Sequence, residues 1–112
     1  MKRIEAIVRP DKVGSVLADL DKIGHPGLMV TEIEGHGKQK GVEQEVRGKK
    51  YKVELLTKAR IEMVVEDKDM DGIVKTIREA AVTGKVGDGK IFVYPVENVV
   101  RIRTAEQGEI AV

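Results

Sequence analysis

Two apolar stripes of helical spacing, set among four segments of strand-like sequence, most constrain how this chain can fold. Residues 2–8 are rich in β-branched side chains and predict a strand, after which Pro10 and Asp11 begin a helix. Glycines and a proline at 24–27 stop that helix, and residues 28–33 predict a second strand. The stripe of the first helix comprises Val13, Val16, Leu17, Leu20 and Ile23.

The second half of the chain repeats this order. Residues 59–65 predict a third strand, after which Asp67 or Asp69 is suited to cap a second helix. Gly84 is placed to end that helix in a left-handed conformation, and residues 91–96 predict a fourth strand. The second stripe comprises Met70, Ile73, Val74, Ile77, Ala80 and Ala81. The order βαββαβ predicts an α+β fold, a ferredoxin-like sandwich whose two helices cover one face of an antiparallel sheet.

The other face of this sheet is expected to be oily, because apolar residues fall on both faces of the strands and the helices cover only one. Monomers seldom expose a large contiguous apolar patch. We therefore expect the chain to form an oligomer through the open face of the sheet.

Composition is typical of a single globular domain spanning residues 1–112. Twenty basic and nineteen acidic residues leave a net charge of +1, which argues against binding to nucleic acid or to a membrane surface. The absence of cysteine excludes a disulfide, a thiolate metal site and a cysteine nucleophile. No apolar run reaches the roughly 18–20 residues of a bilayer span, and we expect a cytoplasmic location.

The connection between the second and third predicted strands, residues 35–57, is too long for an ordinary hairpin. It opens with the polar, glycine-punctuated run GHGKQKG at 35–41, and residues 37–54 hold six basic residues against three acidic ones. A charged loop of this length in a small domain predicts a functional segment. The alternative is a solvated, disordered insertion.

The run TGKVGDGKIFV at 83–93 joins the second helix to the fourth strand. Its three glycines leave backbone N–H groups open to a close ligand, and Lys85 and Lys90 add the positive charge that a phosphate-bearing ligand requires. The alternative is a tight turn in which Gly87 and Gly89 only accommodate unusual dihedral angles.

Five motifs, in order along the whole chain, carry a family resemblance. They are MKRIEAIVRP at 1–10, VTE at 30–32, GxGxQKG at 35–41, TGKVGDGKIFV at 83–93 and VExVVRIRT at 96–104. With these motifs the chain resembles the PII nitrogen-regulatory signal-transduction proteins from end to end.

The resemblance implies a ferredoxin-like trimer whose clefts between subunits bind ATP or ADP. Residues 37–55 would form the effector-docking T-loop, 82–90 the B-loop and 102–112 the C-loop. Mg-ATP would permit 2-oxoglutarate to bind at the base of the T-loop, so that the protein reports nitrogen, carbon and energy status. Family targets include ammonium transporters, enzymes of nitrogen metabolism and nitrogenase regulators, and the T-loop sequence does not name the one that applies.

The resemblance also implies which residues bind the nucleotide. Backbone N–H groups of residues 87–89 and the Lys90 ammonium would hold the polyphosphate, and Arg101 and Arg103 would reach it from a neighbouring subunit. These arginines, two residues apart on extended chain, would point the same way; two surface ion pairs are the alternative. The implied set is Gly37, Lys38, Gln39, Glu62, Val64, Gly87, Asp88, Gly89, Lys90, Arg101 and Arg103, with Glu62 and Val64 on the adenine side.

The 2-oxoglutarate site implied in the same way contains Gln39, Lys40, Gly41 and Lys58. The side-chain oxygen of Gln39 would ligate Mg²⁺ beside the phosphates, as a neutral oxygen ligand of a hard cation. Lys58 would pair with a carboxylate of 2-oxoglutarate.

The chain departs from the family at several positions. Many bacterial relatives carry a uridylylated tyrosine at the position of Tyr51, but the context here, VRGKKY, replaces a tyrosine, a small residue and an acidic one. The reversed charge argues against modification of Tyr51. Lys49 replaces a serine that is phosphorylated in another branch, and His36 replaces a phenylalanine. Met29 replaces a threonine, so a side-chain hydrogen bond to adenine is lost.

Two other functional classes are open to a fold of this kind. A slow nucleotide-hydrolysing enzyme could use the same pocket with Asp88 activating water, but the chain has no cysteine and one serine, Ser15, in the first predicted helix. RNA binding on the sheet would need exposed aromatic side chains, and only Phe92, Tyr94 and Tyr51 are present. We expect a regulator without committed catalysis.

Overall fold

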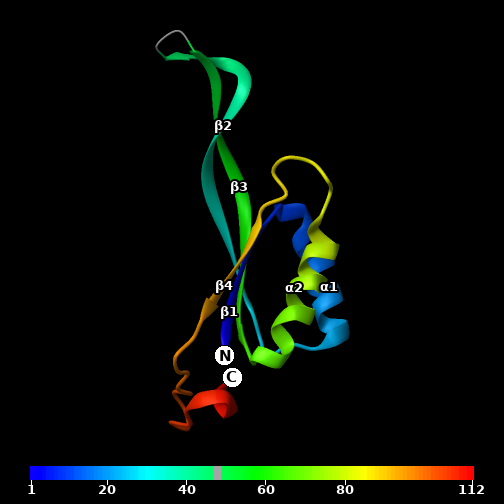
Figure 1. The fold of residues 1–112 in the computed structure, drawn as a ribbon, viewed down its shortest axis with the longest axis vertical. Coiled ribbons are helices and arrows are strands. Elements are labelled where there is room, and N and C mark those ends of the chain that lie inside the picture. Colours follow the sequence, from blue (N-terminus) through cyan, green and yellow to red (C-terminus); the bar gives the residue numbers. More distant parts are fainter. Residues whose placement is uncertain (47–48) are drawn as a thin grey trace.

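Four antiparallel strands form one sheet, and both helices lie on the same face of it (Figure 1). The computed structural model describes the backbone of residues 1–46 and 49–112 and the side chains of residues 1–35 and 56–112. The strands lie in the order β2-β3-β1-β4. The elements are β1 Lys2–Val8, a 3-10 helix η1 Pro10–Lys12, α1 Val13–Ile23, β2 Met29–Val46, β3 Lys49–Val65, α2 Asp67–Ala81, β4 Lys90–Pro95 and a second 3-10 helix η2 Gly108–Ala111. The predicted element order and α+β class are confirmed.

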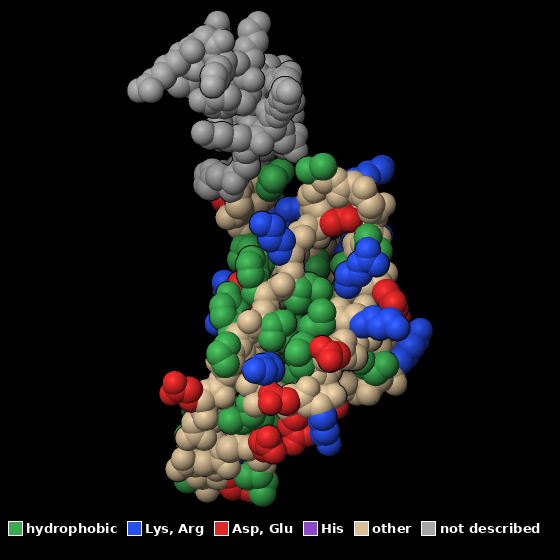
Figure 2. Space-filling model, in the orientation of Figure 1, with side chains coloured by type: hydrophobic (Ala, Val, Ile, Leu, Met, Phe, Trp, Pro, Cys, Tyr) green, Lys and Arg blue, Asp and Glu red, His purple; other side chains and the backbone are tan. Residues whose placement is uncertain are grey.

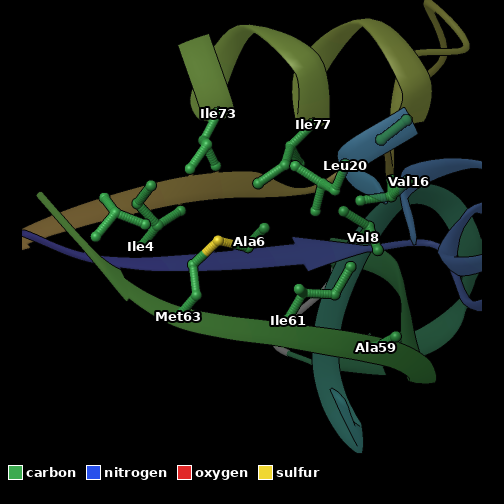
Figure 3. Packing of buried hydrophobic residues seen from close by; sticks show 12 residues of the cluster. Ile4, Ala6, Val8, Val16, Leu20, Ala59, Ile61, Met63, Ile73 and Ile77 are labelled. Carbon is green, nitrogen blue, oxygen red and sulfur yellow. The ribbon is translucent and has the colours of Figure 1, made fainter. Parts of the chain in front are cut away.

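The core lies between the two helices and one face of the sheet (Figure 3). In the register of β1 with β3, Ile4 lies opposite Met63 and Ala6 opposite Ile61, so alternate residues of both strands reach the helices. The buried side chains are Ile4, Ala6, Val8, Val16, Leu20, Ala59, Ile61, Met63, Val65, Ile73, Ile77 and Ala81. The helical members of this set come from the two predicted stripes.

Both helices begin differently from the expectation. Pro10 and Asp11 lie in η1, and α1 starts only at Val13. The N-cap of α2 is Glu66, so neither Asp67 nor Asp69 caps this helix. Asp67 Oδ1 instead accepts a hydrogen bond from the amino group of Met1 at 2.9 Å, and this contact lowers the pKa of the Asp67 carboxyl.

The end of α2 also differs from the expectation. Val82 leaves the helix in an extended conformation, while its N–H still donates to the Arg78 carbonyl at 3.0 Å. Gly84 has the expected positive φ but lies three residues beyond the last helical residue, Ala81, so it does not terminate the helix. Within the part of the chain that the structure describes, no helix is both long and apolar enough to span a bilayer.

Strands β2 and β3 continue beyond the body of the sheet as a long two-stranded hairpin (Figure 1). The prediction of an irregular loop over residues 35–57 is therefore wrong. Backbone pairing runs from Gly35 opposite Leu56 out to Val46 opposite Lys49. Pairing satisfies backbone N–H and C=O groups that a loop would leave to water, which is the physical reason for the extended ladder. The predicted T-loop lies within this hairpin.

The open face of the sheet carries charge at its centre. Arg3 Nη2 lies 2.6 Å from Glu5 Oε2 and 2.5 Å from Glu62 Oε1, and both carboxylate side chains are only 15% exposed. The Arg3 guanidinium also lies over the Tyr94 ring at 5.0 Å, and this ring stacks with that of Phe92. The expected oily face is therefore only partly apolar, because aromatic side chains adjoin an ion-pair cluster.

The glycine at position 72 makes the folded protein less stable than an alanine there would. It lies inside α2, and a β-carbon built on it meets no atom within 4 Å. Glycine in a helix loses more backbone entropy on folding than alanine does, so we expect Gly72→Ala to raise the free energy of unfolding by about 0.5–1 kcal/mol. Urea denaturation measures this change, and a loss of stability would contradict the open environment described for this residue.

Candidate functional site

The connection from α2 to β4, residues 82–89, is organised around the carboxylate of Asp88. Its Oδ2 accepts hydrogen bonds from the backbone N–H groups of Thr83 and Gly84, at 2.8 and 2.9 Å. Its Oδ1 accepts from the Thr83 hydroxyl and from Arg9 Nε, the latter at 3.1 Å. These donors, the Thr83 hydroxyl foremost, hold the pKa of Asp88 well below its usual range. The Asp88 side chain therefore stabilises the conformation of its own loop.

Glycines give this loop its shape. Gly84, Gly87 and Gly89 have φ angles of 84°, 102° and 100°, which side chains other than hydrogen rarely permit. Gly89 also touches the end of β1, because a β-carbon built there would lie 1.7 Å from the Ile7 carbonyl oxygen. Gly89 is needed for this contact whether or not a ligand binds, which agrees with the tight-turn alternative given for Gly87 and Gly89.

Two basic side chains attach the loop to the sheet. Arg9, at the end of β1, donates from Nη2 to the Val86 carbonyl at 2.9 Å, and Lys58 of β3 donates from Nζ to the Gly87 carbonyl. Among the described residues, no hydrogen bond engages the N–H groups of residues 87–89. Two carbonyl groups of the loop are thus held by cations, while the amide hydrogens of residues 87–89 have no protein acceptor among the described residues.

Lys90 adds a positive charge next to these amides. It is the first residue of β4, its side chain is exposed, and it follows Gly89 directly. Amide hydrogens without a protein acceptor, next to a lysine, are groups that could hold an anion.

A cavity of about 380 Å³ opens beside the loop, between α2 and the edge of the sheet. Ile77 and Ala81 of α2 line it together with Ile91 of β4, and Gly89 and Lys90 also form part of its wall. Figure 2 shows hydrophobic side chains gathered in the strip between the sheet and the helices. The volume lies at the lower end of the range for small-molecule sites.

A second pocket, of about 250 Å³, is lined by residues at the start of β2. The start of β2 lies at the opposite end of the sheet from residues 82–89 (Figure 1). Glu62 and Val64, the two residues implied to lie beside adenine, both line it, and so does Met29. Two arginines lie against Glu62, because Arg3 donates to it and Arg60 Nε lies 3.6 Å from its Oε2. The structure therefore brings the predicted adenine-side residues into one concave site.

The predicted arrangement of Arg101 and Arg103 is wrong in one respect. Residues 102–104 form a turn rather than extended chain, with Ala105 N–H donating to the Arg101 carbonyl at 2.8 Å. Arg101 donates from Nη1 to Glu106 Oε1 at 2.8 Å and from Nη2 to the Ile110 carbonyl at 3.0 Å, whereas Arg103 is exposed.

The two groups of cationic candidates lie at opposite ends of β4 (Figure 1). Six residues of strand span roughly 20 Å, so Arg101 and Arg103 cannot reach a phosphate at Lys90 of their own chain. Within one protomer, the structure does not bring these residues together.

The remaining candidates lie on the hairpin, outside the residues whose side chains are described. The backbone register places Lys58 opposite Ile33, and Gln39 lies further out along β2, opposite Lys52. The roles of this group therefore stay predictions. The group comprises Gly37, Lys38, Gln39, Lys40, Gly41 and Tyr51.

Sequence reasoning missed Arg9 and Thr83, both of which bind the Asp88 carboxylate. Arg9 and Asp88 are 79 residues apart in the chain, so no local pattern could indicate their contact. The one available signal for Thr83 was its position just before a glycine and five residues before an acid, a spacing that permits a closed turn.

The sheet, the two helices on one of its faces and the extended hairpin together define a ferredoxin-like α+β domain. The model of the family described as Nitrogen regulatory protein P-II matches residues 1–106. The chain belongs to this family.

Relatives agree with this assignment over the full length of the chain. The nitrogen regulatory protein P-II of Pasteurella multocida is 49% identical over 112 residues, covering 100% of both chains. The protein named P-II 2 of Methanothermobacter thermautotrophicus is also 49% identical, over 100% of this chain and 97% of its own length. Because these relatives are named as regulatory proteins, the chain is placed among signalling regulators.

Two solved structures share the fold. Bacillus subtilis GlnK superposes with a TM-score of 0.84 at 34% identity, covering 99% of this chain and 97% of that one. Arabidopsis thaliana PII bound to citrate superposes with a TM-score of 0.81 at 38% identity, covering 99% and 91%.

Proposed function

We propose that this chain is a homotrimeric sensor that binds ATP or ADP between subunits, and 2-oxoglutarate when Mg-ATP is present. The observation that carries the proposal is the Asp88-centred loop. It presents the amide hydrogens of residues 87–89 beside the Lys90 ammonium, without any protein acceptor among the described residues. Amide hydrogens and an ammonium group are what a polyphosphate requires.

The separation of the candidate residues supports a site shared between protomers. Lys90 lies at one end of β4, while Arg103 and the Glu62 pocket lie toward the other. A head-to-tail contact between two copies would bring the loop of one protomer to the arginines of the next. A cyclic homotrimer closes such contacts into a ring with three equal sites.

The open face of the sheet is the surface we assign to this assembly. It carries the exposed side chains of Phe92 and Tyr94, each about two-fifths exposed. Arg60 Nε is buried on the same face and makes no hydrogen bond among the described residues, because its ion-pair partner Glu62 Oε2 lies 3.6 Å away. An acceptor from another protomer at hydrogen-bond distance would stabilise this buried donor.

2-Oxoglutarate fits the base of the hairpin. Lys58 already lies against the loop, where it donates to the Gly87 carbonyl, and a ligand carboxylate would offer it a stronger, charged acceptor. Arabidopsis PII, which shares the fold, has been solved with citrate, itself a polycarboxylate. In this proposal Gln39 completes the site by ligating Mg²⁺ together with the ATP phosphates.

The extended hairpin is the element we assign to partner recognition, with an ammonium transporter as the first candidate target and a nitrogenase-associated regulator as the alternative. Ligand binding at its base would shift the population of hairpin conformations that a partner can bind.

A dedicated ATP hydrolase is disfavoured, because four hydrogen bonds and a lowered pKa make Asp88 a poor base for activating water.

Calorimetry on single and mixed variants tests the proposal. Lys90→Ala is expected to weaken ATP binding roughly tenfold or more, because a charge-assisted contact to phosphate is lost. The matched control is Lys75→Ala, on the exposed face of α2. A heat of binding for 2-oxoglutarate is expected only when Mg-ATP is present. Unchanged ATP affinity in Lys90→Ala would contradict the assignment of this loop.

Mixing variants tests whether the site is shared. Lys90→Ala and Arg103→Ala proteins are each expected to bind ATP weakly. Mixed trimers formed by refolding them together should regain some tight sites, because an intact loop then meets an intact arginine of its neighbour. If both residues served a site within one protomer, mixing would restore none.

A further inference from the structure

Residues 106–112, here called the C-terminal strap, fold back on their own chain. Gly108 N–H donates to the Val99 carbonyl at 3.0 Å, and Asn98 Nδ2 donates to Gln107 Oε1 at 2.9 Å. A single β-bridge joins Val100 to Gln107. The strap then continues through η2, and the C-terminus is drawn close to the N-terminus, where β1 begins (Figure 1).

The strap forms one wall of the pocket that contains Glu62 and Val64. Ala111 and Val112 line this pocket, opposite residues of β3 and the start of β2. The strap therefore decides how much of the predicted adenine-side pocket is open. The first residues of the strap are also held by the backbone, since Arg101 N–H donates to the Glu106 carbonyl at 2.9 Å. Beyond Gly108, the hydrogen bond from Arg101 to the Ile110 carbonyl is the one that the described residues make between the strap and the preceding chain.

Arg101 is the side chain that holds the strap in place. Its Nη1 donates to Glu106 Oε1 at 2.8 Å and its Nη2 to the Ile110 carbonyl at 3.0 Å, so its guanidinium spans both ends of the strap. Glu106 Oε1 also accepts a hydrogen bond from the Thr104 hydroxyl at 2.7 Å, which fixes the carboxylate in position. The same guanidinium is a candidate phosphate ligand of the proposed nucleotide site.

The turn that brings Glu106 to Arg101 is strained. Ala105 has a φ of 60°, and among the described residues it is the one non-glycine residue with a positive φ. Alanine rarely adopts this conformation, because its β-carbon crowds the following carbonyl. The closed strap thus contains strain that its opening would release.

We propose that Arg101 is a two-position latch, which either holds the strap against the Glu62 pocket or binds the phosphates of a nucleotide. This inference rests on the proposed nucleotide site. Both Nη atoms of Arg101 donate to the strap, so a phosphate bound bidentately by the same Nη edge displaces Glu106 and the Ile110 carbonyl. Binding of the anion therefore releases the strap, and a closed strap lowers the apparent affinity for the anion.

Glu106→Ala tests the latch, with Glu109→Ala as the matched control. Both remove a carboxylate from the strap, but only Glu106 contacts Arg101. By calorimetry, Glu106→Ala is expected to bind ATP roughly tenfold more tightly than wild type, because Arg101 no longer has a competing acceptor. The control should bind ATP as wild type does.

Amide hydrogen exchange supplies an independent readout. Without ligand, Gly108 and the residues after it should exchange faster in Glu106→Ala than in wild type, and saturating ATP should speed their exchange in wild type. If wild type binds ATP and the variant binds it equally or more weakly, the latch is refuted while the nucleotide site stands. If neither protein binds ATP, the proposed function falls and the latch falls with it. If ATP leaves the exchange rates of the strap amides unchanged or lowers them, the proposal that ATP releases the strap is also refuted.

Discussion

Replacing Gly89 by alanine is expected to lower the free energy of unfolding by at least about 3 kcal/mol. Gly89 has a φ of 100°, and the added β-carbon would lie 1.7 Å from the Ile7 carbonyl oxygen. That oxygen belongs to the backbone of β1 next to its pairing with β4, where Ile7 lies opposite Lys90. The clash can be relieved only by moving the loop away from the strand. Chemical denaturation measures the loss, and ATP affinity should fall with it.

Gly84→Ala is the matched control for this substitution. Gly84 has a similar φ of 84°, but a β-carbon built on it meets no atom within 4 Å. Only the dihedral cost of roughly 1 kcal/mol is expected there. Equal destabilisation by the two alanines would show that the contact with β1 does not constrain the loop.

Asp88→Asn is expected to weaken ATP binding by roughly 10- to 100-fold. The amide keeps the size of the carboxylate but turns one acceptor into a donor, which then faces the N–H groups of Thr83 and Gly84 or the Arg9 guanidinium. The loop loses the acceptor that organises it, although no ligand contact of the Asp88 side chain is removed. Calorimetry measures the affinity, and Asp71→Asn, on exposed α2 surface, is the control.

The stabilising effect of Asp88 has a defined dependence on pH. Its pKa is lowered in the folded protein, by the Thr83 hydroxyl first of all. The charged form therefore favours folding above the unfolded pKa of about 3.9, and the contribution is lost as the pH falls below that value. The difference in free energy of unfolding between wild type and Asp88→Asn should be constant near neutral pH and shrink in acid. A difference that grows as the pH falls would contradict the hydrogen bonds described here.

The framework of the fold is predictable from the sequence because its signals are local. Val16 and Leu20 of the first stripe and Ile73 and Ile77 of the second are all buried, as helical periodicity requires. Strands β1 and β4 lie within about a residue of their predicted bounds. The spacing of apolar residues predicts which face of a helix or strand is buried, and it does so without identifying the element that packs against that face.

The candidate site is less predictable, because it depends on contacts between distant segments. The glycine-rich loop was evident, yet its organising bond from Arg9 to Asp88 joins residues 79 positions apart. Arg101 was expected to face a ligand, and the structure shows it holding Glu106 and Ile110 of its own chain. The extended hairpin was read as a loop, since charged and glycine-rich sequence resembles solvated coil until a second strand pairs with it.

By itself the sequence determined the βαββαβ order, the two buried stripes and the position of a glycine-rich loop with two lysines, because spacing and glycine content act within a few residues. Only the tertiary structure decided which cation holds which carbonyl, and which end of β4 each candidate occupies. A carboxylate such as that of Asp88 acquires its role from the donors that packing brings within 3 Å or so, and side-chain pairing at that range follows from strand register, not from composition.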